Sequence, residues 1–512
     1  MRIGVDVGGT NTDAVLMNGP RLITQAKSPT TEDVTSGIVS ALEVIIGEVP
    51  KRSATQAIML GTTHFTNALL ERKNLSRTAI LRLALPATSL LPPLVDWPQD
   101  MSNAIGGYTY LVPGGHEFDG SEIASFDDNA VRKAARDMLR KGVSALAISG
   151  VFSPVNPSHE KRAAAIINQE APDIRISLSH EIGRLGLLER ENAAAYNACL
   201  LETAERTINS IRTALLSLGL QAPLYLSQND GTLMDVAYGE RFPVLAISSG
   251  PTNSMRGAAF LSGIENGIVV DIGGTSTDVG ALVNGFPREA SIAVNLAGVR
   301  TNFRMPDVLS IALGGGSVVK QNPLTIGPSS VGFALAHEAL VFGGKTLTST
   351  DIAVAGSFAD IGDKSLVQSL ETSLVTDTAI EMRRRIERVV DQMKLNANPV
   401  PVILVGGGNI LVGNKLEGAS QVIRPKQAEV ANAIGAAIAQ VGGEVEKVYA
   451  LDGTNRLRVL EEAKAEATTR AVTAGADPNT ITVVEIEEIP LTYLPSNAVR
   501  VRVKVVGDLV GM

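Results

Sequence analysis

Short apolar runs alternate along the chain with longer stretches of mixed polarity. The runs at 57–60, 78–83 and 143–148 predict strands, since a strand covered on both faces is apolar throughout. In the stretch 34–46 the apolar residues recur at helical spacing, and the stretch 127–141 begins at an aspartate and ends before a glycine, as helices do. Strands and helices in alternation predict an α/β fold.

Later segments continue this alternation. Residues 183–218 are rich in Ala, Leu and Glu at helical spacing, which predicts a helical segment, and 364–393 is a second helical stretch. The apolar run 400–405 predicts a strand, and the small-residue stretch 431–441 predicts a helix. Beyond it we expect a strand, a long helix at 459–474 and a pair of strands.

An eight-residue motif occurs twice. Asp6-Val-Gly-Gly-Thr-Asn-Thr-Asp13 recurs as Asp271-Ile-Gly-Gly-Thr-Ser-Thr-Asp278, with six of eight positions identical at an offset of 265. Each copy follows an apolar run and precedes a second one that ends in Asn18-Gly19 or Asn284-Gly285, the dipeptide most typical of tight hairpins. Each copy therefore predicts a strand, a Gly-Thr turn, a strand, an Asn-Gly turn and a strand. The repeat predicts two related half-domains that face each other.

The repeat divides the chain into three predicted units. Residues 1–182 form the first half, and residues 183–441 form a helical segment plus the second half. Residues 442–512 form a small C-terminal α+β unit. The length of the chain is consistent with three units, because 512 residues at about 150 per domain give roughly three domains.

Composition and charge limit the classes of partner and the cellular location that we expect for this protein. With 45 Lys+Arg against 53 Asp+Glu the net charge is −8, so nucleic acid is not an expected partner. The apolar stretch 80–94 is broken by an arginine and three prolines, so we expect no membrane span. The N-terminus lacks the pattern of a signal peptide, and we expect a cytoplasmic protein. The single cysteine, Cys199, is predicted to be a buried structural thiol.

The sequence does not match other common cofactor-binding motifs. Ala339 stands where a P-loop ending in Lys345-Thr346 needs its first glycine. Both Gly-Gly-Thr turns run from strand to strand, whereas a dinucleotide fingerprint joins a strand to a helix. The five histidines show no pair at zinc-ligand spacing, so we expect no zinc site.

The two Gly-Gly-Thr turns are typical of a phosphate site. Paired glycines let consecutive backbone N–H groups point at an anion, and neighbouring hydroxyls add donors. Two such turns facing each other would grip a polyphosphate from both sides. The residues predicted to bind it are Gly8, Gly9, Thr10, Asn11 and Thr12 in the first turn and Gly273, Gly274, Thr275, Ser276 and Thr277 in the second.

Aspartates bracket both turns. They would repel phosphate unless a hard cation lies between them, which predicts Mg²⁺ held through water. We predict that Asp6 and Asp271 hold the metal, although hydrogen bonds to the turns are an alternative role for them. Asp13 and Asp278 are candidates for the same role or for catalysis, by orienting water or accepting a proton.

Further polar and glycine-rich segments lie where ligands gather in α/β sheets. Thr62, Thr63, His64 and Asn67 follow a predicted strand and are candidate substrate residues, with a helix N-cap as the structural alternative. Gly314 and Gly315, in a run of three glycines, belong either to a nucleotide-side loop or to a tight turn.

Several motifs together carry a family resemblance. They include the two hairpins, Leu404 to Asn409 (LVGGGN) and the helix Ala431 to Ala437 (ANAIGAA), in the order found in the actin-like ATPase and sugar kinase superfamily. Within it the chain closely resembles the hydantoinase/oxoprolinase family. The motifs that carry this are Gly61-Thr62-Thr63, Ser179 to Gly183 (SHEIG), Gln228 to Met234 (QNDGTLM), Ser249-Gly250-Pro251 and Gly314 to Ser317 (GGGS).

The resemblance implies a duplicated actin-like ATPase fold, with ribonuclease H-like halves, and an adenosine loop formed by Gly406, Gly407 and Gly408. It also implies an enzyme that uses ATP and Mg²⁺ to open a cyclic amide or imide through phosphorylation of a carbonyl oxygen. A small-molecule kinase, or a nucleotide-gated subunit of a multi-subunit hydrolase or carboxylase, is the alternative. The expected partners are a small-molecule substrate and a second hydantoinase-type subunit or another copy of the chain.

Overall fold

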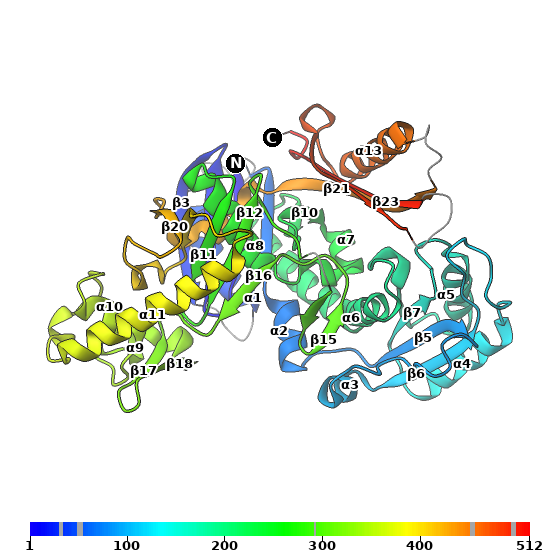
Figure 1. Cartoon of the computed structure of the whole chain (residues 1–512), viewed down its shortest axis with the longest axis horizontal. Helices are drawn as coiled ribbons and strands as arrows, with labels where there is room; N and C mark the ends of the chain where they lie inside the picture. Colours follow the sequence, from blue (N-terminus) through cyan, green and yellow to red (C-terminus); the bar gives the residue numbers. More distant parts are fainter. Residues whose placement is uncertain (30–33, 49–54, 291–292, 451–455, 493–497, 512) are drawn as a thin grey trace.

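A computed structural model describes residues 1–29, 34–48, 55–290, 293–450, 456–492 and 498–511. The protein is a mixed α/β structure with two central sheets, a separate body at one end and a helical extension at the other (Figure 1). This confirms the predicted α/β class. Within the described residues, no helix combines the length and the apolar character needed to cross a membrane.

The larger sheet has nine strands in the order β22-β23-β21-β10-β9-β4-β1-β2-β3. Four of its strands come from the predicted first half: β1 (Arg2–Val7), β2 (Asn11–Asn18), β3 (Arg21–Pro29) and β4 (Ala57–Thr62). The next two, β9 (Leu224–Ser227) and β10 (Thr232–Asp235), come from the predicted second unit. Strand β2 is antiparallel to both β1 and β3, whereas β4 and β9 run parallel to β1. Helix α1 (Val34–Gly47) packs on β3 and β2, and helix α2 (His64–Glu71) follows β4 directly.

The smaller sheet repeats this arrangement. Its main path is β13-β12-β11-β19-β20, and β16 also pairs with β12. The strands are β11 (Gly267–Ile272), β12 (Thr277–Val283), β13 (Phe286–Pro287), β16 (Val308–Ile311), β19 (Val400–Val405) and β20 (Ala419–Ile423). Both sheets thus place the first hairpin strand between its antiparallel partner and a later parallel strand. The predicted hairpins and the predicted duplication are confirmed.

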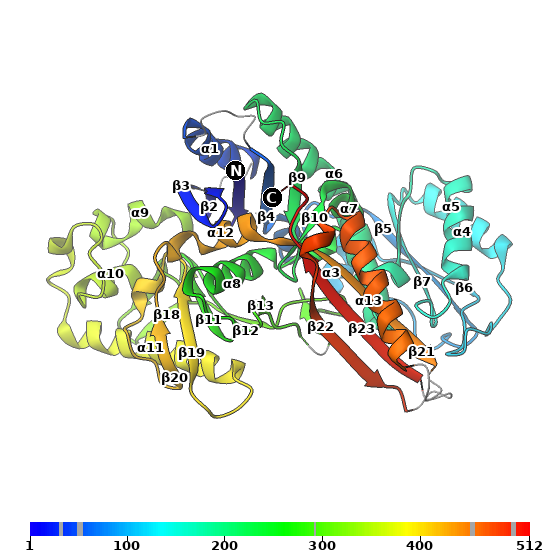
Figure 2. The same cartoon turned by 90° about the horizontal axis from the view of Figure 1, so that it is seen from above.

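Two helices lie between the sheets and join them. They are α8 (Ser249–Ser262) and α12 (Ala431–Ile438), which pack against each other and lie side by side in Figure 2. A Cβ atom on Gly257 would stand 1.9 Å from the carbonyl oxygen of Ala431, and one on Gly435 would stand 1.8 Å from that of Asn253. Only glycine permits so close an approach of two backbones. The contact brings polar residues of both helices to the hairpin turns.

A separate body is inserted after β4 and lies to the right in Figure 1. It has a four-stranded sheet, β6-β5-β7-β8, made of β5 (Thr78–Leu85), β6 (Tyr108–Pro113), β7 (Ala145–Gly150) and β8 (Arg175–Leu178). Its helices are α3 (Gln99–Ile105), α4 (Asp128–Arg140) and α5 (Ser158–Glu170). The long helix α6 (Leu187–Ser217) then packs between this body and the large sheet, with Cys199 fully buried as predicted.

The second half carries its own extension, to the left in Figure 1. It contains the hairpin β17 (Ser317–Lys320) with β18 (Thr325–Ser330) and the helices α9 (Leu335–Glu338), α10 (Ser349–Ala355) and α11 (Thr372–Met393). The helix predicted over 364–393 is therefore two elements, because a 3₁₀ turn at Lys364–Val367 ends before α11 begins. The helical segment predicted from residue 183 likewise begins only at Leu187, after Gly186 in extended backbone.

The C-terminal unit continues the large sheet. Strand β21 (Gln440–Ala450) pairs with β10 and with β23 (Ala498–Gly507), β22 (Thr482–Pro490) forms the edge, and α13 (Arg456–Thr473) covers one face (Figure 2). The helix predicted over 431–441 ends earlier, since Val441 pairs with Leu233 and Gly507 in the sheet. Because the large sheet takes strands from all three predicted units, their boundaries stay a prediction.

Candidate nucleotide and substrate site

The two Gly-Gly-Thr turns lie against each other. The hydroxyl oxygens of Thr10 and Thr275 are 3.5 Å apart, although 265 positions separate them in the chain. Each turn is closed in the same way: the N–H of Gly8 donates to Asn11 O at 3.0 Å, and that of Gly273 donates to Ser276 O at 2.9 Å. The structure therefore brings together the two phosphate turns that the repeat predicted.

Asp6 and Asp13 stand opposite each other at the base of the first turn. The side-chain amide of Asn432 bridges them, donating to Asp6 Oδ2 at 3.1 Å and to Asp13 Oδ2 at 2.9 Å. Asn253 donates to Asp6 Oδ1 at 3.0 Å, and the Lys27 ammonium pairs with Asp13 Oδ1 at 3.0 Å. Burial raises the pKa of Asp6 to about 6, and the charge of Asp13 adds to this effect while the two amides oppose it.

Asp271 and Asp278 occupy the same places in the second turn. Burial raises the pKa of Asp271 to about 7, opposed by a hydrogen bond from Ser254 and reinforced by the charges of Asp278, Asp6 and Asp13. Burial also raises the pKa of Asp278, which accepts a short hydrogen bond from the Ser310 hydroxyl. Four carboxylates therefore share one region and repel one another.

The donor set fits a hydrated divalent cation. Among the described residues, Lys27 alone forms an ion pair with any of the four aspartates. The described residues contain no group of three or more His, Cys, Asp or Glu side chains placed to ligate a metal together. An ion here would consequently take most of its ligands from water and from a bound phosphate, as Mg²⁺ does.

The run Gly314 to Gly316 packs directly on the second turn. Gly315 N donates to Gly273 O at 3.0 Å, Gly316 N donates to Gly274 O at 2.7 Å, and Gly314 N donates to the Ser317 hydroxyl at 2.8 Å. Their N–H groups are thus used within the protein, so these glycines fix the shape of the turn. Direct contact of Gly314 and Gly315 with a nucleotide stays a prediction.

The loop Gly406 to Gly408 follows β19 and lies beside Asp271. Gly406 has a φ of +79°, which glycine adopts readily, and its N–H donates to Ala428 O at 2.9 Å. Gly408 N donates to Ile272 O at 2.7 Å. A Cβ atom placed on Gly407 would meet no atom within 4 Å, so the loop presents open space next to the second turn.

In the first half, the end of β4 corresponds to the loop after β19, because each of these strands lies parallel to the first strand of its hairpin. Thr62 pairs with Val7, and the Thr63 hydroxyl donates to Val7 O at 3.1 Å. The Thr62 hydroxyl accepts from His64 N at 3.1 Å, which is a helix-start contact, and Asn67 lies in the first turns of α2. His64 is half-buried, and burial followed by the charge of Arg206 lowers its pKa. The predicted substrate residues thus adjoin the first phosphate turn, and their role stays a prediction.

Several polar residues at the site were missed from the sequence. Lys27 and Ser310 lie directly opposite Asp13 and Asp278 on neighbouring strands, so the strand register identifies them. The sequence contained a signal for Lys27, since pairing the two strands across the Asn18-Gly19 turn places Lys27 opposite Asp13. Asn253 and Asn432 come from helices far away in the sequence, and no local pattern marks them.

The fold and the paired turns define the class of protein: a duplicated α/β protein with ribonuclease H-like, or actin-like, halves. Comparison with known protein families identifies the family within this class. Residues 2–171 match the hydantoinase/oxoprolinase N-terminal region, and residues 190–357 match the hydantoinase/oxoprolinase domain. The chain belongs to the hydantoinase/oxoprolinase family.

Individual relatives agree with this assignment. The chain is 30% identical to the caprolactamase subunit alpha of Pseudomonas jessenii over 70% of its length and 55% of the relative's. It is 27% identical to the acetophenone carboxylase gamma subunit of Aromatoleum aromaticum over 69% of its length and 52% of the relative's. The chain thus spans about half the length of these curated relatives.

A solved structure shows the same fold. The ATP-dependent caprolactamase from Pseudomonas jessenii superposes with a TM-score of 0.78 at 20% identity, covering 99% of this chain and 87% of that one. The agreement extends over nearly the whole chain, including the C-terminal strands.

Proposed function

We propose that the chain binds Mg-ATP between its two Gly-Gly-Thr turns and transfers the γ-phosphoryl group to the carbonyl oxygen of a cyclic amide or imide. The observation that carries the proposal is the contact between the turns, whose threonine hydroxyls lie 3.5 Å apart. Beside them lie the buried Asp6 and Asp13 and the half-buried Asp271 and Asp278. Facing backbone N–H groups and hydroxyls provide donors for a polyphosphate. The caprolactamase named among the relatives supports the ATP-dependent, cyclic-amide class.

Each element of the site has a proposed role. Gly8 to Thr12 and Gly273 to Thr277 bind the phosphates, and Gly406 to Gly408 form the surface for adenosine. Asp6 and Asp271 hold Mg²⁺ through water, and the ion supplies neutralisation of the triphosphate charge. Asp13 or Asp278 orients the attacking group or accepts its proton. Thr62, Thr63, His64 and Asn67, next to the first turn, contact the substrate.

The proposed chemistry explains why ATP is needed. An unstrained amide resists water at neutral pH because its nitrogen is a poor leaving group. Transfer of the phosphoryl group forms a bond to the carbonyl oxygen and releases ADP. Water then adds to the activated carbon, the ring C–N bond breaks as the nitrogen takes up a proton, and the resulting acyl phosphate is hydrolysed to carboxylate and phosphate.

A second candidate is action as one subunit of a larger enzyme. Two of the relatives are named as subunits, one of a caprolactamase and one of a carboxylase, and the chain spans about half their length. In this case the chain would perform the ATP-dependent step and a partner subunit would complete the reaction. A small-molecule kinase, whose product keeps the phosphate, is a further alternative. A cytoplasmic location is part of the proposal.

The reaction is tested by mixing the purified chain with Mg-ATP and a panel of five- to seven-membered lactams, imides and hydantoins. We expect phosphate release that a cyclic amide stimulates, with the ring-opened acid found by mass spectrometry. A phosphorylated product that persists would identify a kinase instead. If no cyclic amide stimulates phosphate release, either alone or with a co-purified partner, the cyclic-amide reaction is wrong.

Nucleotide placement is tested by three matched glycine variants. A Cβ atom at Gly9, Gly407 or Gly413 meets nothing within 4 Å, so the fold accepts alanine at each. We expect Gly9→Ala and Gly407→Ala to weaken ATP binding about tenfold or more, because the added methyl group occupies space meant for nucleotide. Gly413→Ala, outside the site, is the control. Equal affinity of all three variants in calorimetry would contradict the proposed pose.

A further inference from the structure

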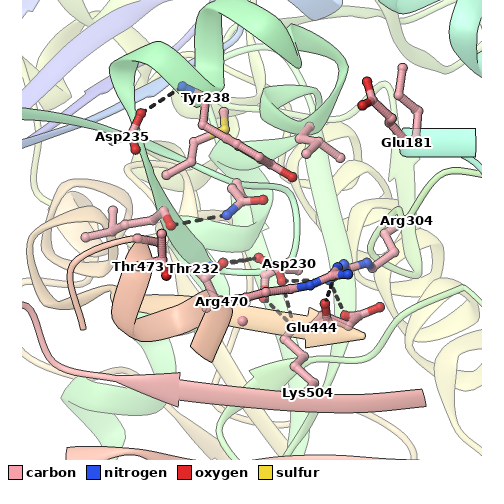
Figure 3. A pocket seen from close by; sticks show the side chains of 18 of the residues that line it. Glu181, Asp230, Thr232, Asp235, Tyr238, Arg304, Glu444, Arg470, Thr473 and Lys504 are labelled. Carbon is pink, nitrogen blue, oxygen red and sulfur yellow. Dashed lines mark hydrogen bonds and ion pairs between the residues drawn. The ribbon is translucent and has the colours of Figure 1, made fainter. Parts of the chain in front are cut away.

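A cavity lies where the C-terminal unit meets the earlier strands of the large sheet (Figure 3). Its volume is about 510 Å³, within the range of sites for small organic ligands. Its wall is formed by β10, β21, β23, α13 and α7 (Val236–Arg241), together with the segment around Arg304. None of the site residues predicted from the sequence lines it.

The cavity is separate from the nucleotide site. Strand β10 is three strands away from β1 in the large sheet. At about 4.8 Å between neighbouring strands, β10 lies about 14 Å across the sheet from β1, the strand that leads into the first phosphate turn. Phosphoryl transfer needs reacting atoms about 3–3.5 Å apart, so a ligand in this cavity would not be the phosphoryl acceptor.

Buried charges form one side of the cavity. Asp230, Glu444 and Lys504 are each less than a tenth exposed in their side chains. Lys504 Nζ is 2.9 Å from Asp230 Oδ2, and Arg304 NH1 is 3.2 Å from the same oxygen. Burial alone would raise the pKa of Asp230, but the charges of Lys504 and Arg304 hold it below its ordinary value.

Protein groups already saturate these two carboxylates. Asp230 Oδ1 accepts from the N–H and hydroxyl of Thr232 at 3.0 and 2.6 Å, and its Oδ2 pairs with Lys504 and Arg304. Glu444 accepts from Arg502 Nε at 3.0 Å and forms a short contact with Arg304. Neither carboxylate therefore needs a cation from a ligand.

The arginines in the wall keep unused donors. Within the part of the chain that the structure describes, Arg304 donates only through NH1, and its side chain is 28% exposed. Arg470 donates from NH1 to Glu444 O and from NH2 to Glu466, while its Nε has no acceptor among the residues that the structure describes. Unused guanidinium N–H groups that face a cavity are a site for a carboxylate.

Part of the cavity lining is apolar. Ile182, Leu245 and the ring of Tyr238 contribute apolar surface to it. Two further acids of the lining are engaged, since Glu181 pairs with Arg241 at 2.5 Å and Asp235 caps α7 by accepting from Tyr238 N at 2.7 Å. Figure 3 shows Tyr238 and Glu181 above the group formed by Arg304, Asp230, Glu444 and Lys504.

We infer that this cavity binds a small carboxylate with an apolar body. The carboxylate would accept from Arg304 and Arg470, and the body would lie on Ile182, Leu245 and Tyr238. Such a ligand would connect α13 of the C-terminal unit to the segment that carries Arg304. The inference does not depend on the proposed reaction, because it concerns binding without nucleotide.

The test is calorimetry on the full chain, without ATP, using three probes with one apolar body and different charges. They are 3-phenylpropanoate, 3-phenylpropanamide and 3-phenylpropylamine. We expect one site for the carboxylate, binding at least tenfold weaker for the neutral amide and no binding of the amine. Equal affinity for the amide, or no carboxylate binding at millimolar concentration, would overturn the inference.

Variants locate the bound probe. Arg470→Gln should weaken carboxylate binding about tenfold, and Thr473→Trp, in the cavity wall, should abolish it by filling the space. Arg458→Gln is the matched control, because Arg458 is also an exposed arginine of α13 paired with a glutamate four residues away. Binding that survives both Arg470→Gln and Thr473→Trp would place the probe elsewhere and refute the site.

Discussion

The two halves carry the same turn but balance its charge differently. In the first half, Lys27 forms an ion pair with Asp13, and the amides of Asn253 and Asn432 donate to the carboxylates. In the second half, the side chains that donate to Asp271 and Asp278 among the described residues are the hydroxyls of Ser254 and Ser310. The described residues therefore place no cation at the second turn, where a cation bound with the nucleotide would favour the ionised carboxylates.

The third strand of each half explains this difference. In the first half, β3 is nine residues long and places Lys27 opposite Asp13. In the second half, β13 has only two residues and ends far from the turn, so β16 takes the place beside β12 and sets Ser310 opposite Asp278. One duplicated hairpin thus acquired two electrostatic environments through the length of a neighbouring strand.

The largest effect is expected from Asp6 and Asp271, the aspartates proposed to hold Mg²⁺. Asp271→Asn should lower ATP-dependent phosphate release by about 100-fold or more, because no protein cation replaces the lost interaction with Mg²⁺. In Asp6→Asn the rate of phosphate release should fall about tenfold less than in Asp271→Asn, since the first turn keeps the positive charge of Lys27. Initial rates at saturating Mg-ATP measure both. Asp307→Asn, whose carboxylate pairs with Arg288 away from the turns, is the control, and equal losses in Asp6→Asn and Asp271→Asn would remove the proposed asymmetry.

The next effect concerns the pH dependence of stability. The pKa of Asp271 is raised from 3.8 to about 7, so the folded state keeps this proton while the unfolded state loses it between pH 4 and 7. The stability contribution is present at low pH and is lost as the pH rises through that window. Asparagine does not titrate, so Asp271→Asn does not lose stability as the pH rises. Its free energy of unfolding should therefore exceed the wild-type value by on the order of 4 kcal/mol near pH 7. Urea unfolding from pH 4 to 8 would show a growing gap, and a gap that stays constant with pH would contradict the raised pKa.

A smaller effect is expected from the bridging amide of the first turn. Asn432→Ala removes the donor shared by Asp6 and Asp13 and leaves two buried carboxylates short of a partner. We expect a loss of about 1–3 kcal/mol in the free energy of unfolding. Asn209→Ala, at an exposed position of α6, is the control. Chemical denaturation of both variants measures the difference, and an unchanged midpoint for Asn432→Ala would show that the bridge carries no stability.

The smallest effect separates two equivalent threonines. Thr277 donates to Leu313 O at 2.5 Å, whereas the buried hydroxyl of Thr12 has no protein partner among the described residues. Without nucleotide, Thr277→Val should lower stability by about 1 kcal/mol and Thr12→Val should not. With ATP, the two variants should gain the same thermal shift, because both hydroxyls are buried and closed to a bound phosphate. Thermal shifts with and without ATP measure both effects, and equal stability of the two variants without ATP would contradict the assigned roles.

The sequence predicted a large part of the fold. The Gly-Gly-Thr and Asn-Gly turns identify themselves locally, so both hairpins and their duplication were predicted correctly. The end of the helix at 438 was missed, because Val441 joins a sheet whose partner strands lie about 200 residues earlier and 66 residues later. Asn253 and Asn432 were missed for the same reason, since their positions depend on the packing of α8 against α12.

The amino-acid sequence by itself determined the twin turns, the aspartates that bracket them and the family to which the chain belongs. These features depend on residues adjacent in the chain, where glycine conformation and turn chemistry act locally. Only the tertiary structure decided which side chains neutralise each carboxylate, and it alone formed the charged cavity from residues between 181 and 504. Charge compensation and cavity shape depend on distances between segments remote in sequence, which are set when helices and strands pack.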